Sequence, residues 1–173
     1  MRPYFSAAHS SCVYEGCIKE LIHKFKYNNK RILAGVFTSL MLDFIEDNPE
    51  ITDGVEMITF VPLHNRRLNE RAFNQSELLA VNIGKKLKIP VTDCLEKIRL
   101  TKNQNELSRD ERLINIAGAF RIKRNAKQDL PKGADILMID DVMTTGATLN
   151  ETSRVLIEAG AGKVRCFTLA RGV

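Results

Sequence analysis

The sequence has no tryptophan, and aromatic side chains make up only 6% of its 173 residues. It contains no hydrophobic run of the roughly 20 residues that a membrane-spanning helix needs, and its first residues lack the apolar core of a signal peptide. Four scattered cysteines, Cys12, Cys17, Cys94 and Cys166, indicate reduced thiols rather than a disulfide framework. These absences predict a soluble protein, with a cytoplasmic location as the default expectation.

The composition is typical of one globular domain. Hydrophobic residues make up 44% and charged residues 27% of the chain, and we find no internal repeat or low-complexity segment. The net charge of +5 is mildly basic. This charge is compatible with an anionic ligand such as a phosphate ester, with weak nucleic-acid contact or with a basic solvated surface, and it does not choose among them.

Hydrophobic periodicity divides the chain into strands and helices. Two segments lack such a pattern: residues 63–72 are expected to form a basic loop, and residues 95–106 an irregular excursion. Asn74 followed by Glu77 is typical of a helix N-terminus. The expected strands cover residues 8–14, 57–61, a short stretch from Pro90, 119–122, 134–139 and 164–170, and the expected helices cover residues 18–25, 32–45, 74–87, 108–115 and 148–159.

The C-terminal segment has the most regular pattern. A buried strand over residues 134–139 is followed by a polar turn over 140–147, a helix capped by Thr148 and Glu151, and a final strand over 164–170. Strand, helix and strand in this order form a βαβ unit, in which the strands are parallel and the crossover is right-handed. We therefore expect an α/β fold with a mostly parallel twisted sheet and helices on both faces.

Two adjacent carboxylates and a threonine-rich turn follow the strand over 134–139. Ligands of parallel sheets bind beyond the carboxyl ends of the strands, where Asp140 and Asp141 are expected. The turn leads into a helix N-terminus, which attracts phosphate through unpaired N–H groups and a partial positive charge. Carboxylates suit vicinal sugar hydroxyls, and they could also balance a Mg²⁺–diphosphate or a developing positive charge. The combination predicts a site for a phosphorylated sugar; the turn consists of Thr144, Thr145, Gly146, Ala147 and Thr148.

Residues 136–148 resemble the phosphoribosyl-pyrophosphate motif of type I phosphoribosyltransferases, in which four apolar residues precede two acids and a Thr-Thr-Gly-small-Thr turn. The resemblance implies the type I phosphoribosyltransferase fold with a small hood. It also implies that Asp140 and Asp141 contact the ribose hydroxyls and act in catalysis, while residues 144–148 hold the 5-phosphate. The implied ligand is phosphoribosyl pyrophosphate with Mg²⁺, and the ion is expected through the ligand diphosphate rather than in a protein metal site.

Two other protein classes and a simple helix cap share parts of this motif. Walker B strands also end in acids, but they need a Gly-x4-Gly-Lys-Ser/Thr loop that this sequence lacks. Receiver domains carry their acidic pair near the N-terminus. Asp141 and Thr148 could merely cap a helix, but capping does not need the whole string of residues.

Further segments resemble the ComF family, which contains competence-associated, amidophosphoribosyltransferase-like proteins of bacteria. This resemblance implies one domain, with an N-terminal helical hood part over about residues 14–56 and a core over about 57–171. The zinc-binding cysteine ribbon that usually begins ComF proteins is absent from this sequence. Its nearest substitutes match no standard zinc spacing; they are His9, Cys12, Cys17 and His23. The segments that carry the resemblance are residues 21–27, 61–64, 66–67, 71–76, 107–115 and 118–120.

The resemblance implies further site residues outside the motif. Type I phosphoribosyltransferases place a pyrophosphate loop where Pro62, Leu63 and His64 stand, and Arg66, Arg67 and Arg71 could then grip a diphosphate. Residues 95–106 resemble the mobile hood loop, with Arg99 and Lys102 as catalytic candidates, although an ordinary exposed connection explains them equally well. On the first helix His23, Lys24 and Lys26 could line a site, but solvent is the favoured interpretation.

Two functional hypotheses remain open from the sequence. The chain is either a phosphoribosyltransferase with an unidentified acceptor, or a binding module that keeps the phosphate site as an adaptor in DNA uptake, with a competence helicase or primosome protein as partner. A homodimer is compatible with both. Direct nucleic-acid binding is not favoured, because the basic residues are not interleaved with aromatic ones.

Overall fold

The computed structural model describes residues 3–27, 31–101, 109–126 and 130–172. Its centre is a four-stranded parallel sheet in the order β1-β6-β5-β2. The strands are β1 (Ala7–Val13), β2 (Met57–Phe60), β5 (Ile136–Met143) and β6 (Val164–Arg171). An isolated bridge between Ile58 and Val91 continues the sheet beyond β2, so the strand expected near Pro90 is reduced to one paired residue.

The predicted βαβ unit is confirmed. Strand β5 pairs in parallel with β6, and helix α6 (Ala147–Glu158) connects them. Residues 136–139 are all buried, which suits a strand covered on both faces. Pairing of β1 with β6 joins the N-terminal strand to the C-terminal one.

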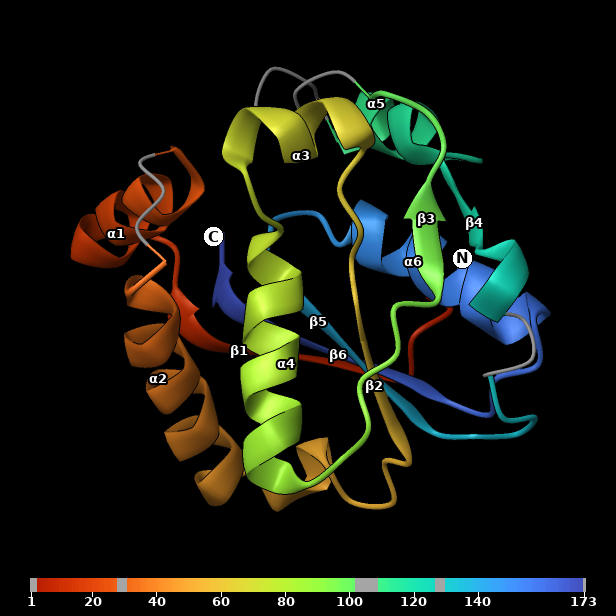
Figure 1. Cartoon of the computed structure of the whole chain (residues 1–173), viewed down its shortest axis with the longest axis horizontal. Helices are drawn as coiled ribbons and strands as arrows, with labels where there is room; N and C mark the ends of the chain where they lie inside the picture. The colour runs from red at the N-terminus through yellow and green to blue at the C-terminus, as the bar shows by residue number, and fades with distance from the viewer. Residues whose placement is uncertain (1–2, 28–30, 102–108, 127–129, 173) are drawn as a thin grey trace.

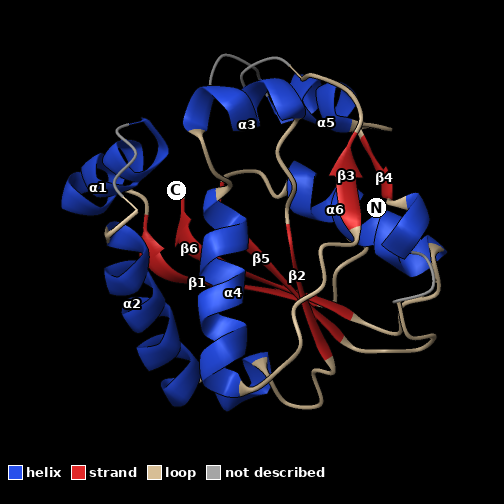
Figure 2. Ribbon diagram, in the orientation of Figure 1, coloured by secondary structure: helices blue, strands red, loops and turns tan. Residues whose placement is uncertain are grey.

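Helices cover both faces of the sheet, as the sequence predicts (Figure 1; Figure 2). On one face a hydrophobic cluster joins helices α1 (Gly16–Tyr27), α2 (Leu33–Asp47) and α4 (Gln75–Leu87) to the strands through residues such as Phe25, Phe37 and Leu79. On the other face Leu149 and Leu156 of α6 pack with residues of helix α5 (Arg109–Ile116) and of a small second sheet. The N-terminal helices therefore share a core with the sheet.

The second sheet corrects one expectation. Part of the predicted irregular excursion over 95–106 is strand β3 (Leu95–Lys97), which pairs antiparallel with β4 (Phe120–Ile122). Leu95 and Phe120 are buried in the same hydrophobic cluster as Leu149 and Leu156, which holds these two strands beside α6. Residues 102–106 lie outside the described residues.

A second correction concerns the basic segment 63–72, which is not a loop but contains helix α3 (Asn65–Arg71). The His64 imidazole caps it, since its Nδ1 accepts a hydrogen bond from the backbone N–H of Arg66 at 3.3 Å. An ion pair between Arg66 and Glu70, one turn apart, supports the same helix. Short 3₁₀ turns at Pro49–Ile51 and Arg124–Ala126 complete the elements.

Two details at the end of β5 also differ from the prediction. Asp140 and Asp141 lie within the strand rather than in a turn, because Asp140 is still in register with Thr168 of β6. Helix α6 begins at Ala147 with Gly146 at its N-cap, so Thr148 is not the cap. Glu151 does not complete a capping box either: it accepts the Gly118 N–H and pairs with Arg154.

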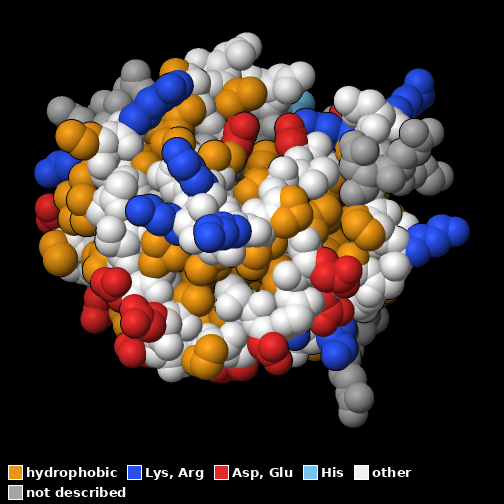
Figure 3. Space-filling model, turned by 60° about the horizontal axis from the view of Figure 1, so that its bottom comes forward, with side chains coloured by type: hydrophobic (Ala, Val, Ile, Leu, Met, Phe, Trp, Pro, Cys, Tyr) orange, Lys and Arg blue, Asp and Glu red, His pale blue; other side chains and the backbone are white. Residues whose placement is uncertain are grey.

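The surface on the side away from α3 carries charges of both signs. In Figure 3, Lys and Arg side chains lie among hydrophobic ones across the middle, and Asp and Glu side chains gather toward the lower rim. The net charge of +5 is therefore not concentrated there as one basic patch. None of the helices within the described ranges is long and apolar enough to cross a membrane.

Candidate functional site

A cavity of about 300 Å³ opens at the carboxyl ends of the parallel strands, and we call it the first cavity. It brings together parts of the chain that are far apart in sequence: helix α1, helix α3, the start of α4, strand β3 and the end of β5. The lining residues with polar or charged side chains are Tyr14, His23, Lys26, Tyr27, Arg67, Arg71, Asn74, Gln75, Ser76, Lys97, Asp140, Asp141, Thr144 and Thr148.

The acidic pair forms the floor of the first cavity. The Ser76 hydroxyl donates to Asp140 Oδ1 at 2.8 Å, and the backbone N–H of Asp141 donates to the same oxygen at 2.8 Å. Burial and the neighbouring Asp141 carboxylate raise the pKa of Asp140 to about 7, although these hydrogen bonds and Lys26 act in the opposite direction. Ser76 is a site residue that sequence reasoning missed.

Lys26 does not face solvent, as the sequence had led us to expect, but lies in the site. Its ammonium bridges both oxygens of Asp141, at 2.9 Å to Oδ1 and 2.8 Å to Oδ2, and only 18% of its side chain is exposed. His23, three residues earlier on α1, also lines the first cavity. Helix α1 is thus joined to the acidic pair by an ion pair between residues 115 positions apart.

The threonine-rich turn has the geometry of an anion site. Gly146 has a φ of 75°, a left-handed conformation that favours glycine, and no side chain caps the N-terminus of α6. The backbone N–H of Ala147 donates a long hydrogen bond, 3.4 Å, to the Thr145 hydroxyl, and the first N–H groups of a helix have no partner within the helix itself. Thr144 and Thr148 line the first cavity beside them.

Of the basic residues on α3, Arg67 and Arg71 line the first cavity. Arg71 lies over the Tyr27 ring, 5.1 Å from its centroid, and donates to Gln75. Arg66 turns outward, with 70% of its side chain exposed and its guanidinium paired with Glu70. Pro62 and Leu63 lie at the end of β2 and line the same cavity, whereas His64 does not.

Lys97 is a second residue that sequence reasoning missed. Its ammonium donates to the Thr101 hydroxyl at 2.9 Å and lies 5.3 Å from the centroid of the Phe120 ring. Burial and the positive charge of Arg67 lower the pKa of Lys97 to about 8. Arg99 does not line the first cavity; its guanidinium donates to the carbonyls of Asn115 and Ala117. Lys102 lies outside the described residues.

The part of the chain that the structure describes contains no cluster of three or more His, Cys, Asp and Glu side chains that could hold a metal ion. Cys12 lies in β1 against the first hydrophobic cluster, and Cys17 is exposed on α1. The two carboxylates of the first cavity offer the oxygen ligands that Mg²⁺ prefers, but too few for a complete coordination sphere. They fit an ion whose remaining ligands are water and ligand phosphates.

An acidic pair followed by an uncapped glycine turn, at the carboxyl edge of a parallel sheet, defines a class of sugar-phosphate site. The sequence profile of the phosphoribosyl transferase domain matches residues 74–172, which include the acidic pair and the glycine turn but neither α1 nor α3. The chain belongs to the phosphoribosyl transferase domain family.

Curated relatives narrow the group to ComF-like proteins. The DNA utilization protein YhgH of Escherichia coli is 31% identical over 163 residues, which cover 91% of this chain and 69% of the relative. Competence protein ComFC of Bacillus subtilis is 33% identical over 91% of this chain and 61% of the relative, and competence protein F of Haemophilus influenzae is 30% identical over 87% and 66%. The chain thus spans about two thirds of the length of these relatives.

Solved phosphoribosyltransferase structures are more distant. Adenine phosphoribosyltransferase of Saccharomyces cerevisiae aligns with a TM-score of 0.49 at 16% identity, over 80% of this chain and 69% of that one. Glutamine phosphoribosylpyrophosphate amidotransferase of B. subtilis aligns with a TM-score of 0.43 at 22% identity, over 65% of this chain and 22% of that one.

Proposed function

We propose that the chain binds phosphoribosyl pyrophosphate with Mg²⁺ in the first cavity and transfers the phosphoribosyl group to an acceptor. The observation that carries this proposal is the meeting, in one cavity, of the Asp140–Asp141 pair, the uncapped start of α6 and the cations Arg67, Arg71 and Lys97. A phosphate monoester, a diol and a diphosphate need these three kinds of partner.

Different residues of the first cavity would contact each part of the ligand. The 5-phosphate accepts hydrogen bonds from the first N–H groups of α6 and from the hydroxyls of Thr144 and Thr148. The ribose hydroxyls donate to the carboxylates of Asp140 and Asp141, so they compete with Lys26 for the oxygens of Asp141. The diphosphate lies toward α3 and β3, where the guanidinium and ammonium groups neutralise it.

The proposed reaction is a displacement at the anomeric carbon. A nucleophilic acceptor atom forms a bond to C1 while the bond from C1 to the diphosphate oxygen breaks, and the electron pair leaves with the diphosphate. Asp140 and Asp141 stabilise the positive charge that develops on the ribose ring, because they are held in place before the reaction by Ser76 and Lys26. Mg²⁺, when bound, supplies neutralisation of the departing diphosphate.

Calorimetric titration with phosphoribosyl pyrophosphate and Mg²⁺ tests the site. We expect Asp140→Asn/Asp141→Asn to weaken binding by at least about 100-fold, because two charged hydrogen-bond acceptors are lost. Asp43→Asn/Asp47→Asn on the exposed face of α2 is the matched control, since it changes the net charge equally and lies outside the cavity. Equal binding by both double variants would reject the acidic pair as the ribose site.

The second candidate function is a phosphoribosyl-ligand-binding adaptor in natural competence and DNA uptake, without turnover. It is favoured by the names of the relatives, two of which are competence proteins and one a DNA utilization protein. A competence helicase or primosome protein is the proposed partner, and a homodimer fits either function. Release of pyrophosphate with any of a panel of amine and base acceptors would decide for the enzyme; ligand binding with no release across the panel would decide for the adaptor.

A further inference from the structure

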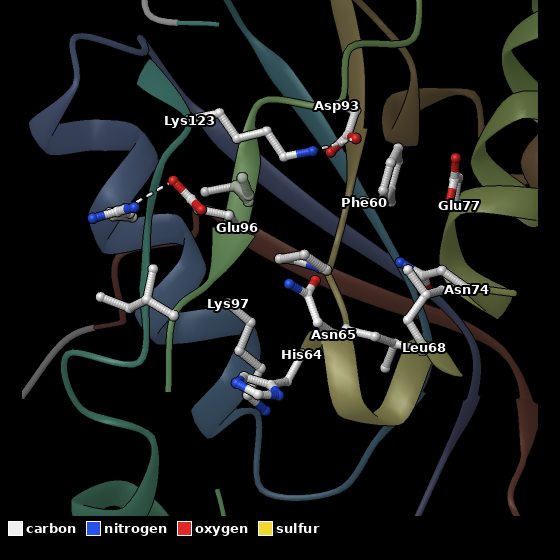
Figure 4. Close-up of a pocket in the computed structure, with 15 residues that line it drawn as sticks. Phe60, His64, Asn65, Leu68, Asn74, Glu77, Asp93, Glu96, Lys97 and Lys123 are labelled. Carbon is white, nitrogen blue, oxygen red and sulfur yellow. Dashed lines mark hydrogen bonds and ion pairs between the residues drawn. The ribbon is translucent and has the colours of Figure 1, made fainter. Parts of the chain in front are cut away.

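A second and larger cavity, of about 520 Å³, lies next to the first. It is bounded by the end of β2, by α3, by the first turn of α4 and by the β3–β4 sheet (Figure 4). It shares Pro62, Leu63, Asn74 and Lys97 with the first cavity, so Lys97 stands where the two meet. A small molecule can therefore approach this side chain from either cavity.

Three lysine side chains line the two cavities in the part of the chain that the structure describes. Lys26 is held by the acidic pair, and Lys123 is paired with Asp93 at the other end of the second cavity from Lys97 (Figure 4). Lys97 forms no ion pair with any described carboxylate, and its ammonium donates to the Thr101 hydroxyl at 2.9 Å. A carboxylate holds lysine in its protonated form far more strongly than a hydroxyl does, so Lys97 is the lysine of this set that most easily loses a proton.

The surroundings of Lys97 are cationic as well as partly buried. Burial and the charge of Arg67 lower the pKa of Lys97 to about 8. Arg99 and Arg71 act in the same direction, while Asp140 opposes them. At pH 7.5 about a quarter of such side chains carry the neutral amine, against roughly 0.1% for an ordinary lysine. A lysine that is desolvated beside other cations is therefore a nucleophile near neutral pH.

The same cations select the kind of reagent that this amine can meet. Arg67 and Arg71 line the first cavity together with Lys97, and guanidinium groups bind phosphate oxygens. An acyl phosphate carries a phosphate for these groups and a carbonyl carbon for the amine. Its phosphate is also the leaving group, so the guanidiniums stabilise the negative charge that develops on it. A phosphorylated aldehyde lacks this last advantage, because its phosphate does not leave.

We propose that Lys97 is a site of acylation by acyl phosphates. The neutral amine nitrogen forms a bond to the carbonyl carbon, the bond from that carbon to the phosphate oxygen breaks, and the electron pair leaves with the phosphate. The extra proton on the nitrogen passes to water, so the products are an amide and inorganic phosphate. The amide carries no charge, so acylation removes one of the cations that line the first cavity. A consequence that rests on the function proposed above is that the acylated chain binds phosphoribosyl pyrophosphate about tenfold more weakly.

Acetyl phosphate is the probe, and peptide mass spectrometry of the full chain after timed incubation measures the acetylation rate at each lysine. We expect Lys97 to react at least about tenfold faster than Lys123 in the second cavity or Lys85 on the exposed face of α4. Arg67→Ala should slow the reaction at Lys97 about tenfold, because it removes a phosphate ligand and raises the pKa of the amine. Arg66→Ala, whose side chain faces solvent, is the matched control and should leave the rate unchanged. Equal rates at the three lysines would overturn the proposal.

An uncharged acetyl ester, p-nitrophenyl acetate, separates the contribution of the phosphate from that of the amine. The preference for Lys97 over the other lysines should be smaller with the ester, because only the reactivity of the amine distinguishes them there. The same preference with both reagents would reject acyl phosphates as the class of reagent. Because each preference is a ratio within one protein, a difference in stability between variants does not imitate the result.

The modification site and the function proposed for the first cavity fail separately. Acetylation of Lys97 should persist in Asp140→Asn/Asp141→Asn, because loss of the Asp140 charge lowers the pKa of the amine further. Preferential acetylation in a chain that does not bind phosphoribosyl pyrophosphate would reject that function and support the modification site. Lys97→Arg, treated with acetyl phosphate in the same way, controls for acetylation at other lysines. Equal affinity for phosphoribosyl pyrophosphate before and after acetylation of Lys97 would overturn the proposed effect on the first cavity.

Discussion

The two cavities share a wall but differ in how their charges are arranged. In the first, four Lys and Arg side chains face two carboxylates, whereas in the second three Lys and Arg side chains face three carboxylates. An excess of cations around the start of a helix suits a polyanion, whereas a lining with equal numbers of positive and negative side chains has no net attraction for one. The two adjacent cavities of this small domain therefore differ in the net charge of their walls.

Their origins in the fold differ as well. The first cavity lies at the carboxyl ends of parallel strands, a position that the sheet provides in every protein of this architecture. The second is lined by the β3–β4 sheet on one side and by residues of α3 and the start of α4 on the other. Lys97 lines both cavities, so a substitution of this residue would alter both of them.

After the loss of the acidic pair, the largest expected effect separates two neighbouring arginines on α3. Arg67→Ala should weaken binding of phosphoribosyl pyrophosphate by about tenfold or more, because a charged hydrogen-bond donor to the diphosphate is lost. Arg66→Ala should change it by no more than about twofold, since Arg66 faces solvent beside Glu70. Calorimetry on both variants checks this, and equal losses would show that α3 acts only through its net charge.

The pH dependence of binding should show a narrow optimum. The pKa of Asp140, raised to about 7, makes its carboxylate available only as pH rises through that value. The pKa of Lys97, lowered to about 8, makes its ammonium disappear as pH rises further, so affinity for phosphoribosyl pyrophosphate should fall about tenfold between pH 7 and 9. Lys97→Met should flatten this alkaline limb, whereas Lys85→Met on the exposed face of α4 should leave it; an unchanged limb in Lys97→Met would exclude Lys97 from the diphosphate site.

The smallest expected effect concerns the ion pair between helix α1 and the acidic pair. The charge of Lys26 lowers the pKa of Asp140, so Lys26→Met should raise that pKa and move the acid limb of binding to higher pH. At pH 7 this should weaken binding about threefold, with Lys26→Arg restoring it. Lys24→Met, exposed on the same helix, is the control, and thermal unfolding monitors the stability of each variant. An acid limb that stays in place would mean that Lys26 only holds α1 to the sheet.

Sequence patterns over short stretches of the chain predicted most of the fold. The strand, turn and helix from residue 134 onward are encoded by consecutive residues, so the parallel pair and the position of Asp140 and Asp141 at its carboxyl edge could be predicted. Helix α3 could not, because its stabilising contacts are a histidine cap and one exposed ion pair rather than an apolar stripe. The prediction that Thr148 caps α6 was wrong, because Gly146 is the N-cap residue of that helix.

The sequence by itself determined the class of fold, the family and the threonine-rich turn after the acidic pair, because each depends on residues close together in the chain. Only the tertiary structure decided which distant side chains complete the site. Lys26 and Ser76 reach the acidic pair from 115 and 64 residues away, and nothing in the local sequence distinguishes them from solvated residues. Lys97 likewise becomes special only when β3 buries its ammonium between the two cavities, where desolvation changes its chemistry.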